Sequence, residues 1–144
     1  MAAFQKFYCV AEDKWAGVHD LTTGTSHVLK VLLTNSAPSA SHATKSDLTE
    51  IAAGNGYTAG GATVTLTSGA QTAGTFKLVL DDVTITAASG SIGPFRYAVL
   101  YNDTPTSPAD PLLGWWDYGT ALTLADGQQF VVDFSAVNGV LTDA

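Results

Sequence analysis

Charged residues are scarce in this sequence, making up 13% of its 144 residues, against the usual ~25%. Only six are basic and the net charge is −7, so no cationic stripe is available to neutralise phosphates. This shortage excludes nucleic acid as a partner. The surface must instead be built from Thr, Ser, Ala, Gly and Asn. Such a surface suits a protein that packs against other proteins, or equally a plain β domain with Thr-rich outer faces.

Cysteine and long apolar runs are also missing. Cys9 is the single cysteine, which excludes an internal disulfide and a thiolate metal cluster. No apolar run reaches the roughly 18 residues of a membrane-spanning helix, so no membrane partner is expected. The first residues lack the basic end and continuous apolar core of a signal peptide. We therefore expect synthesis and retention in a reducing cytoplasm until any assembly leaves the cell.

The patterns that mark enzymes and metal sites are absent as well. The histidines share no metal-ligand spacing; they are His19, His27 and His42. A glycosidase needs paired carboxylates, but Asp81 and Asp82 are adjacent on an expected strand and so point to opposite faces. The glycine-rich run at 54–61 lacks the Lys and the strand–loop–helix context of a phosphate-binding loop. We predict no enzyme, no cofactor and no metal site.

Aromatic residues, by contrast, concentrate between positions 93 and 119. The run 95–101 is apolar on both faces of a strand, so it should be covered on both sides. A second run at 112–118 follows a Pro-rich loop, which predicts a long-looped hairpin at the middle of a sheet. Trp115 and Trp116 must face opposite ways. One is expected in the core and the other on a surface patch that binds sugar or, in preference, a partner subunit.

Arg96 is the single arginine and lies in the central predicted strand beside apolar neighbours. A buried guanidinium needs a carboxylate partner. Asp117 lies on the expected pairing strand and is the first candidate, with Asp133 the second. We predict a buried structural ion pair between Arg96 and Asp117.

Residues 3–18 show the spacing of an amphipathic helix, with Gly17 as a stop signal. A strand over 4–10 is the competing interpretation, because aromatics and Val favour strands. We prefer the helix, whose apolar stripe would lie across the sheet or a neighbouring subunit. Its aromatics and the two tryptophans of the hairpin are the candidate assembly contacts: Phe4, Phe7, Tyr8, Trp15, Trp115 and Trp116.

The remaining chain consists of short alternating runs separated by turn residues. A buried strand is expected at 27–35, and Thr44 to Asp47 fits a capping box that starts one helical turn through residues 48–51. Further strands are expected at 62–67, 75–80, 83–87, 128–134 and 140–142. About eight strands of this kind predict a mainly β chain: one domain, 1–144, forming an antiparallel β-sandwich or barrel with a short N-terminal helix.

Several segments in combination resemble a family of small virion structural proteins encoded by tailed bacteriophages. The likeness covers nearly the whole chain; the segments are KVLLTNSAP (30–38), EIAAGNGYTAGG (50–61), GPFRYAVLYND (93–103), PLLGWWDYG (111–119) and VDFSAVNGVLT (132–142). This resemblance implies a non-enzymatic structural role in the virion and carries over no catalytic residue.

Within that class we expect a capsid decoration, or cement, protein on the outer head shell. Its implied partners are the major capsid protein and neighbouring copies of itself, as a homo-oligomer. Its implied location is the capsid surface of the virion, after synthesis in the host cytoplasm. The alternative is a tail-associated or fibre module that contacts the host surface, and a cell-wall hydrolase is a distant third.

Overall fold

The computed structural model describes residues 3–143 and is mainly β, with 47% strand and 7% helix. This confirms the predicted class, and its antiparallel sheets are consistent with a β-sandwich. The elements in chain order are β1 (Gln5–Lys6), α1 (Cys9–Trp15), β2 (Leu29–Thr34), the 3-10 turn η1 (Lys45–Asp47), β3 (Ala62–Val64), β4 (Leu66–Thr72), β5 (Thr75–Leu80), β6 (Val83–Thr86), β7 (Ile92–Asn102), β8 (Leu112–Leu124), β9 (Gln129–Val132) and β10 (Leu141–Asp143).

One layer is a five-stranded sheet in the order β1-β8-β7-β2-β3, and every pairing in it is antiparallel. Its two longest strands are β7 and β8, with Val99 opposite Trp115. The predicted long-looped hairpin at the middle of a sheet is therefore confirmed. The register shifts near Phe95, where β8 carries extra residues before Leu122, and such bulges bend a strand.

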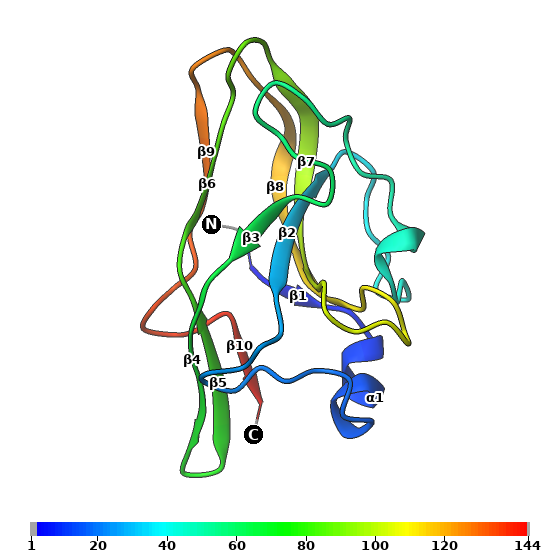
Figure 1. Cartoon of the computed structure of the whole chain (residues 1–144), viewed down its shortest axis with the longest axis vertical. Helices are drawn as coiled ribbons and strands as arrows, with labels where there is room; N and C mark the ends of the chain where they lie inside the picture. Colours follow the sequence, from blue (N-terminus) through cyan, green and yellow to red (C-terminus); the bar gives the residue numbers. More distant parts are fainter. Residues whose placement is uncertain (1–2, 144) are drawn as a thin grey trace.

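The second layer is divided between two smaller ladders. β10, β5 and β4 form a three-stranded sheet, and β6 pairs with β9. Figure 1 shows β6 and β9 facing β7 and β8 in the upper half, and the β4–β5 hairpin at the lower end. The chain passes almost directly from β5 to β6, so the two ladders follow one another along the same side of the molecule.

The core follows the alternation of β7 and β8 except at the register shift between Phe95 and Tyr97, which places these two residues on opposite faces. Phe95 and Trp116 point between the layers, where they meet aromatic rings of the second layer and its connections. Tyr97, Val99 and Trp115 point to the outer face, where a smaller apolar cluster is covered by Phe7 and by loop residues. Both faces of the central strand are thus buried, as its sequence predicted.

The N-terminal helix is shorter than predicted. The expected helix at 3–18 is wrong over its first half, because Gln5 and Lys6 form β1 and pair with Trp115 and Gly114 of β8. Tertiary packing overrides helical spacing here: the extended chain places Phe4 on Trp116 and Phe7 on Trp115, on opposite faces of the sheet. The predicted stop is right, since Gly17 follows α1 with a φ of +75°.

Two further expectations concern the long connection from β2 to β3. The predicted capping box exists, but it starts a single 3-10 turn, η1, rather than a turn through residues 48–51. The glycine-rich run at 54–61 provides close backbone approach. A Cβ added at Gly61 would lie 1.9 Å from the Val31 carbonyl oxygen, and the φ of this residue is +88°.

Candidate functional site

The six candidate assembly contacts fall into two groups. Phe7, Trp115 and Trp116 are buried in the chain's own core, and Phe4 is half-buried against Trp116. The expectation that one of the two tryptophans lies on a surface patch is therefore wrong. The chain itself covers both faces of β8 at these two residues. Tyr8 and Trp15 are the two candidates left at the surface, with 73% and 84% of their area exposed.

Tyr8 immediately precedes α1 and Trp15 ends it. Val10 is the buried residue of this seven-residue helix, and the Tyr8 N–H donates to the Ala40 carbonyl at 2.9 Å. At the other end, Lys14 Nζ lies 5.0 Å from the centre of the Trp15 ring and pairs with Asp143 of β10. The helix is thus held by its flanks while its aromatic residues project outward.

A cavity of about 430 Å³ opens between α1 and the lower sheet. Its apolar walls come from α1, the following loop, β5, β8 and β10, and they are Val10, Leu21, Phe76, Leu113 and Leu141. Its charged residues are Lys6, Lys14, Asp20 and Asp143, and the exposed Trp15 is also part of its lining. The walls are brought together from both ends of the chain.

A polar cluster at the edge of this cavity determines which ring nitrogen of two histidines accepts a hydrogen bond. The Thr104 N–H donates to Asn102 Oδ1 at 3.2 Å, so Asn102 Nδ2 is the donor side of the amide. That nitrogen lies 3.1 Å from His19 Nδ1 and 3.0 Å from His27 Nδ1. Both ring atoms must therefore accept, and the Asp20 N–H also donates to His27 Nδ1. The proton of neutral His19 is consequently on Nε2.

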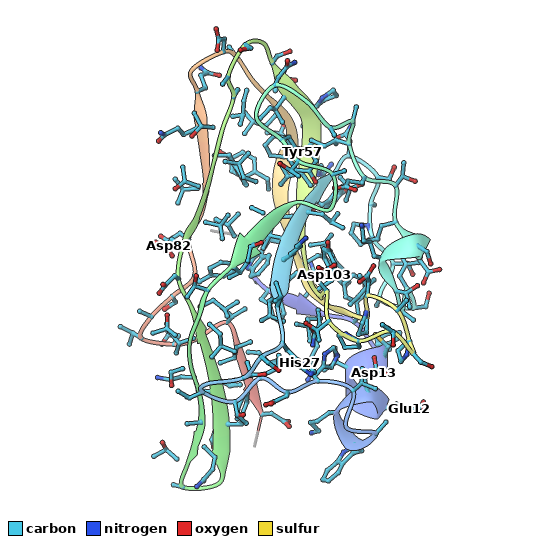
Figure 2. The ribbon with its side chains drawn as sticks, viewed as in Figure 1. Glu12, Asp13, His27, Tyr57, Asp82 and Asp103 are labelled. Carbon is cyan, nitrogen blue, oxygen red and sulfur yellow. The ribbon has the colours of Figure 1, made fainter. Side chains whose placement is uncertain are left out.

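His19 Nε2 faces Asp13 Oδ2 of α1 across 4.0 Å, too far for a hydrogen bond. Neither atom has a hydrogen-bond partner among the described residues, although both are buried. Burial, and to a lesser extent the nearby His27, lowers the pKa of His19 to about 4. Burial also raises the pKa of Asp13. In Figure 2, Asp13 on α1 and His27 on the chain entering β2 lie near one another at the α1 end.

Cys9, the single cysteine, is a packed thiol. Its Sγ donates to the carbonyls of Ala43 and Leu112 at 3.6 and 3.5 Å. Burial and the negative charge of Asp13 raise the pKa of the thiol to about 11. Because the thiolate is the nucleophile, this residue is poorly suited to covalent catalysis.

The predicted partner of Arg96 is present. Arg96 Nε and Nη2 donate to Asp117 Oδ1 and Oδ2 at 2.8 and 3.0 Å, a bidentate pair. The pair is not buried as predicted, since 40% and 32% of the two side chains remain exposed. Arg96 and the Gly119 N–H both lower the pKa of Asp117. The pair is a partly exposed ion pair that links β7 to β8 where the register of the two strands shifts.

Asp81, Asp82 and Asp103 each have a different partner, and Asp103 also lies close to Asp110, whose pKa is raised by burial and by this neighbouring carboxylate. Asp81 accepts from Thr67 and Asp82 from the Phe134 N–H, while Asp103 pairs with Lys30 at 3.4 Å. Figure 2 shows Asp82 in the second layer, well away from Asp103. These residues do not form the paired carboxylates that glycoside hydrolysis requires.

Sequence reasoning missed Asn102, Leu141 and Asp143 as parts of this region. Asn102 is fully buried and bridges two histidines. No local signal marks such contacts, because the partners of Asn102 are 75 and 83 positions away along the chain. Leu141 and Asp143 belong to β10, at the opposite end of the chain from the helix they face, so local spacing does not reveal their contribution either.

Within residues 3–143, no three His, Cys, Asp or Glu side chains are grouped so that they could hold a metal ion. Over the same residues, no helix combines the length and apolarity needed to cross a membrane. No protein-family model, curated protein or solved structure matches this chain.

Proposed function

We propose that this chain is a structural protein of a tailed-bacteriophage particle, and specifically a decoration protein on the outer surface of the capsid. In this role it contacts the major capsid protein and neighbouring copies of itself, and it has no catalytic activity. The resemblance of five sequence segments to phage virion proteins supports the class, and the low charged content of 13% supports a life in contact with other proteins.

The observation that carries the assembly role is the exposure of Trp15. A tryptophan that is 84% exposed leaves a large apolar area in water, and burying such area is worth roughly 25 cal/mol per Å². Beside it lie the apolar cavity and, at the start of α1, the exposed Tyr8. Aromatic residues are enriched in protein interfaces, and most often supply the contacts that dominate binding.

Copy number tests the proposed location. Purified particles are separated on a denaturing gel, and the band of this chain is quantified against the major capsid protein. A decoration protein is expected in hundreds of copies per particle. A few copies, in small multiples of three or six, would instead place the chain in the tail and would overturn the capsid proposal.

Binding to preformed heads tests the proposed activity directly. Expanded heads that lack the chain are titrated with purified protein, and we expect saturable binding and greater resistance of the heads to heat. Because Phe7 belongs to the core, deletion of the N-terminal segment is expected to destabilise the fold, so point variants are used instead. The double variant Tyr8→Ala/Trp15→Ala should fold normally and bind more weakly. Absence of saturable binding by the wild type would refute the proposal.

A further inference from the structure

The cavity beside α1 and the side chain at its mouth are mismatched within one copy of the chain. The cavity of about 430 Å³ has apolar walls formed by Val10, Leu21 and Leu141 among others. Trp15 belongs to the same lining, yet 84% of its area is exposed. The chain therefore presents the apolar Trp15 ring beside an apolar cavity on one surface, and the ring does not fill the cavity of its own chain.

The charged residues around this cavity limit which molecular surfaces can bind there without electrostatic repulsion. Its lining contains two lysines, Lys6 and Lys14, and two aspartates, Asp20 and Asp143, whose charges cancel. The chain as a whole carries −7, so two copies repel one another over most of their surfaces. At this neutral patch they do not. Lys14 and Asp143 already pair within each copy, and Lys6 of one copy can face Asp20 of the other.

We propose that this patch is a self-association surface, at which two copies meet across a two-fold axis and each inserts Trp15 into the cavity of the other. A two-fold contact uses the same patch on both copies, so a ring and a hollow on one surface are self-complementary. The exchange buries both rings and both sets of apolar walls. The inference rests on the assembly role proposed above and names the neighbouring copy as the partner of this site.

The first test measures association of the purified chain by sedimentation equilibrium. The wild type is expected to dimerise, and Trp15→Ala should weaken the dimer by roughly 30-fold or more per ring removed, as for interface residues whose truncation is most costly. Tyr8→Ala is the matched control, because Tyr8 is 73% exposed beside the same helix and is not part of the cavity lining. It should leave the dimer intact.

The second test separates insertion from simple surface contact. Ala11 lines the cavity from the exposed side of α1, so Ala11→Phe fills the hollow of its own chain. This variant retains the Trp15 ring but has no cavity to receive one. Trp15→Ala lacks the ring but keeps the apolar walls formed by Val10, Leu21 and Leu141. Each should be monomeric alone. Their mixture should form heterodimers held by one insertion, weaker than the wild-type dimer.

Tryptophan fluorescence reports the environment of the ring. Trp115 and Trp116 are buried, so a blue shift on raising the protein concentration identifies Trp15 as the residue that leaves water. A wild-type chain that stays monomeric, a dimer unaffected by Trp15→Ala, or a mixture of variants that forms no heterodimer would each overturn the proposal. These measurements use no phage particles, so they test self-association separately from binding to heads. Either proposal can be refuted while the other holds.

Discussion

His19 should make the stability of the fold depend on pH between about 6.5 and 4. The pKa of this histidine is about 4 in the folded chain, against 6.5 for the unperturbed side chain. The native state therefore binds fewer protons than the unfolded state across this range. The resulting stability is present above the unfolded pKa and is lost as the pH falls toward the folded pKa.

The size of the effect follows from the two pKa values. They differ by about 2.5, and each pH unit corresponds to about 1.4 kcal/mol, so the full loss is about 3 kcal/mol below pH 4. At pH 5 about 2 kcal/mol of this has gone. The side chain is only 4% exposed, so solvent screening reduces these values little. Asp13 acts in the opposite direction, because its raised pKa favours proton uptake by the folded chain.

Urea unfolding at pH 7 and pH 5 measures this contribution. We expect the loss of unfolding free energy between the two pH values to be smaller by about 2 kcal/mol in His19→Asn than in the wild type. Asparagine can still accept the hydrogen bond from Asn102. His42→Asn is the control, because His42 lies in the loop after β2 and outside the cluster. Equal pH dependence in His19→Asn and wild type would refute the reasoning.

Three further predictions concern single side chains. Arg96→Ala should lower the melting temperature by a few degrees at most, because its bidentate pair with Asp117 is exposed to solvent; thermal denaturation in low and high salt checks this. Phe7→Ala should destabilise the chain by about 3–5 kcal/mol, since the ring is 1% exposed and lies 4.5 Å from the Trp115 ring centre. Tyr8→Ala, one position later, should change the urea midpoint little. The Cys9 thiol should react slowly with iodoacetamide at pH 8 in the folded chain and rapidly in urea, because its folded pKa is about 11.

The strand pattern was predictable because it depends on short-range alternation. The run 95–101 is apolar on both faces, and both faces are buried. The pairing of Arg96 with Asp117 was also accessible, since the hairpin brings β7 and β8 together and few other partners were available. The exposure of the pair was not predicted, because it lies beside the register shift near Phe95. Gly119, a glycine inside a strand run, was a local signal of that irregularity.

The N-terminal segment was mispredicted because its structure depends on long-range contacts and not on local spacing. Phe4, Phe7 and Tyr8 fit a helical stripe, but an edge of β8 and two tryptophans offered a better site for an extended chain. Period alone cannot reveal that competition, because the edge belongs to residues more than 100 positions away along the chain. The cavity was missed for the same reason, because its walls come from α1, β5, β8 and β10. The Asn102 cluster was also missed, because it joins β7 to the loop between α1 and β2.

The N-terminal aromatic residues have two different roles. Phe7 packs in the core, whereas Tyr8 and Trp15 are exposed and available for contacts with other molecules. A seven-residue helix is far too short to be stable alone. α1 therefore persists because Phe7 is anchored on Trp115 and Val10 is buried beneath the helix. Tyr8 and Trp15 contribute no core packing, as their exposure shows. Substituting either should leave the fold intact, so any loss of association that follows reports on contacts between molecules.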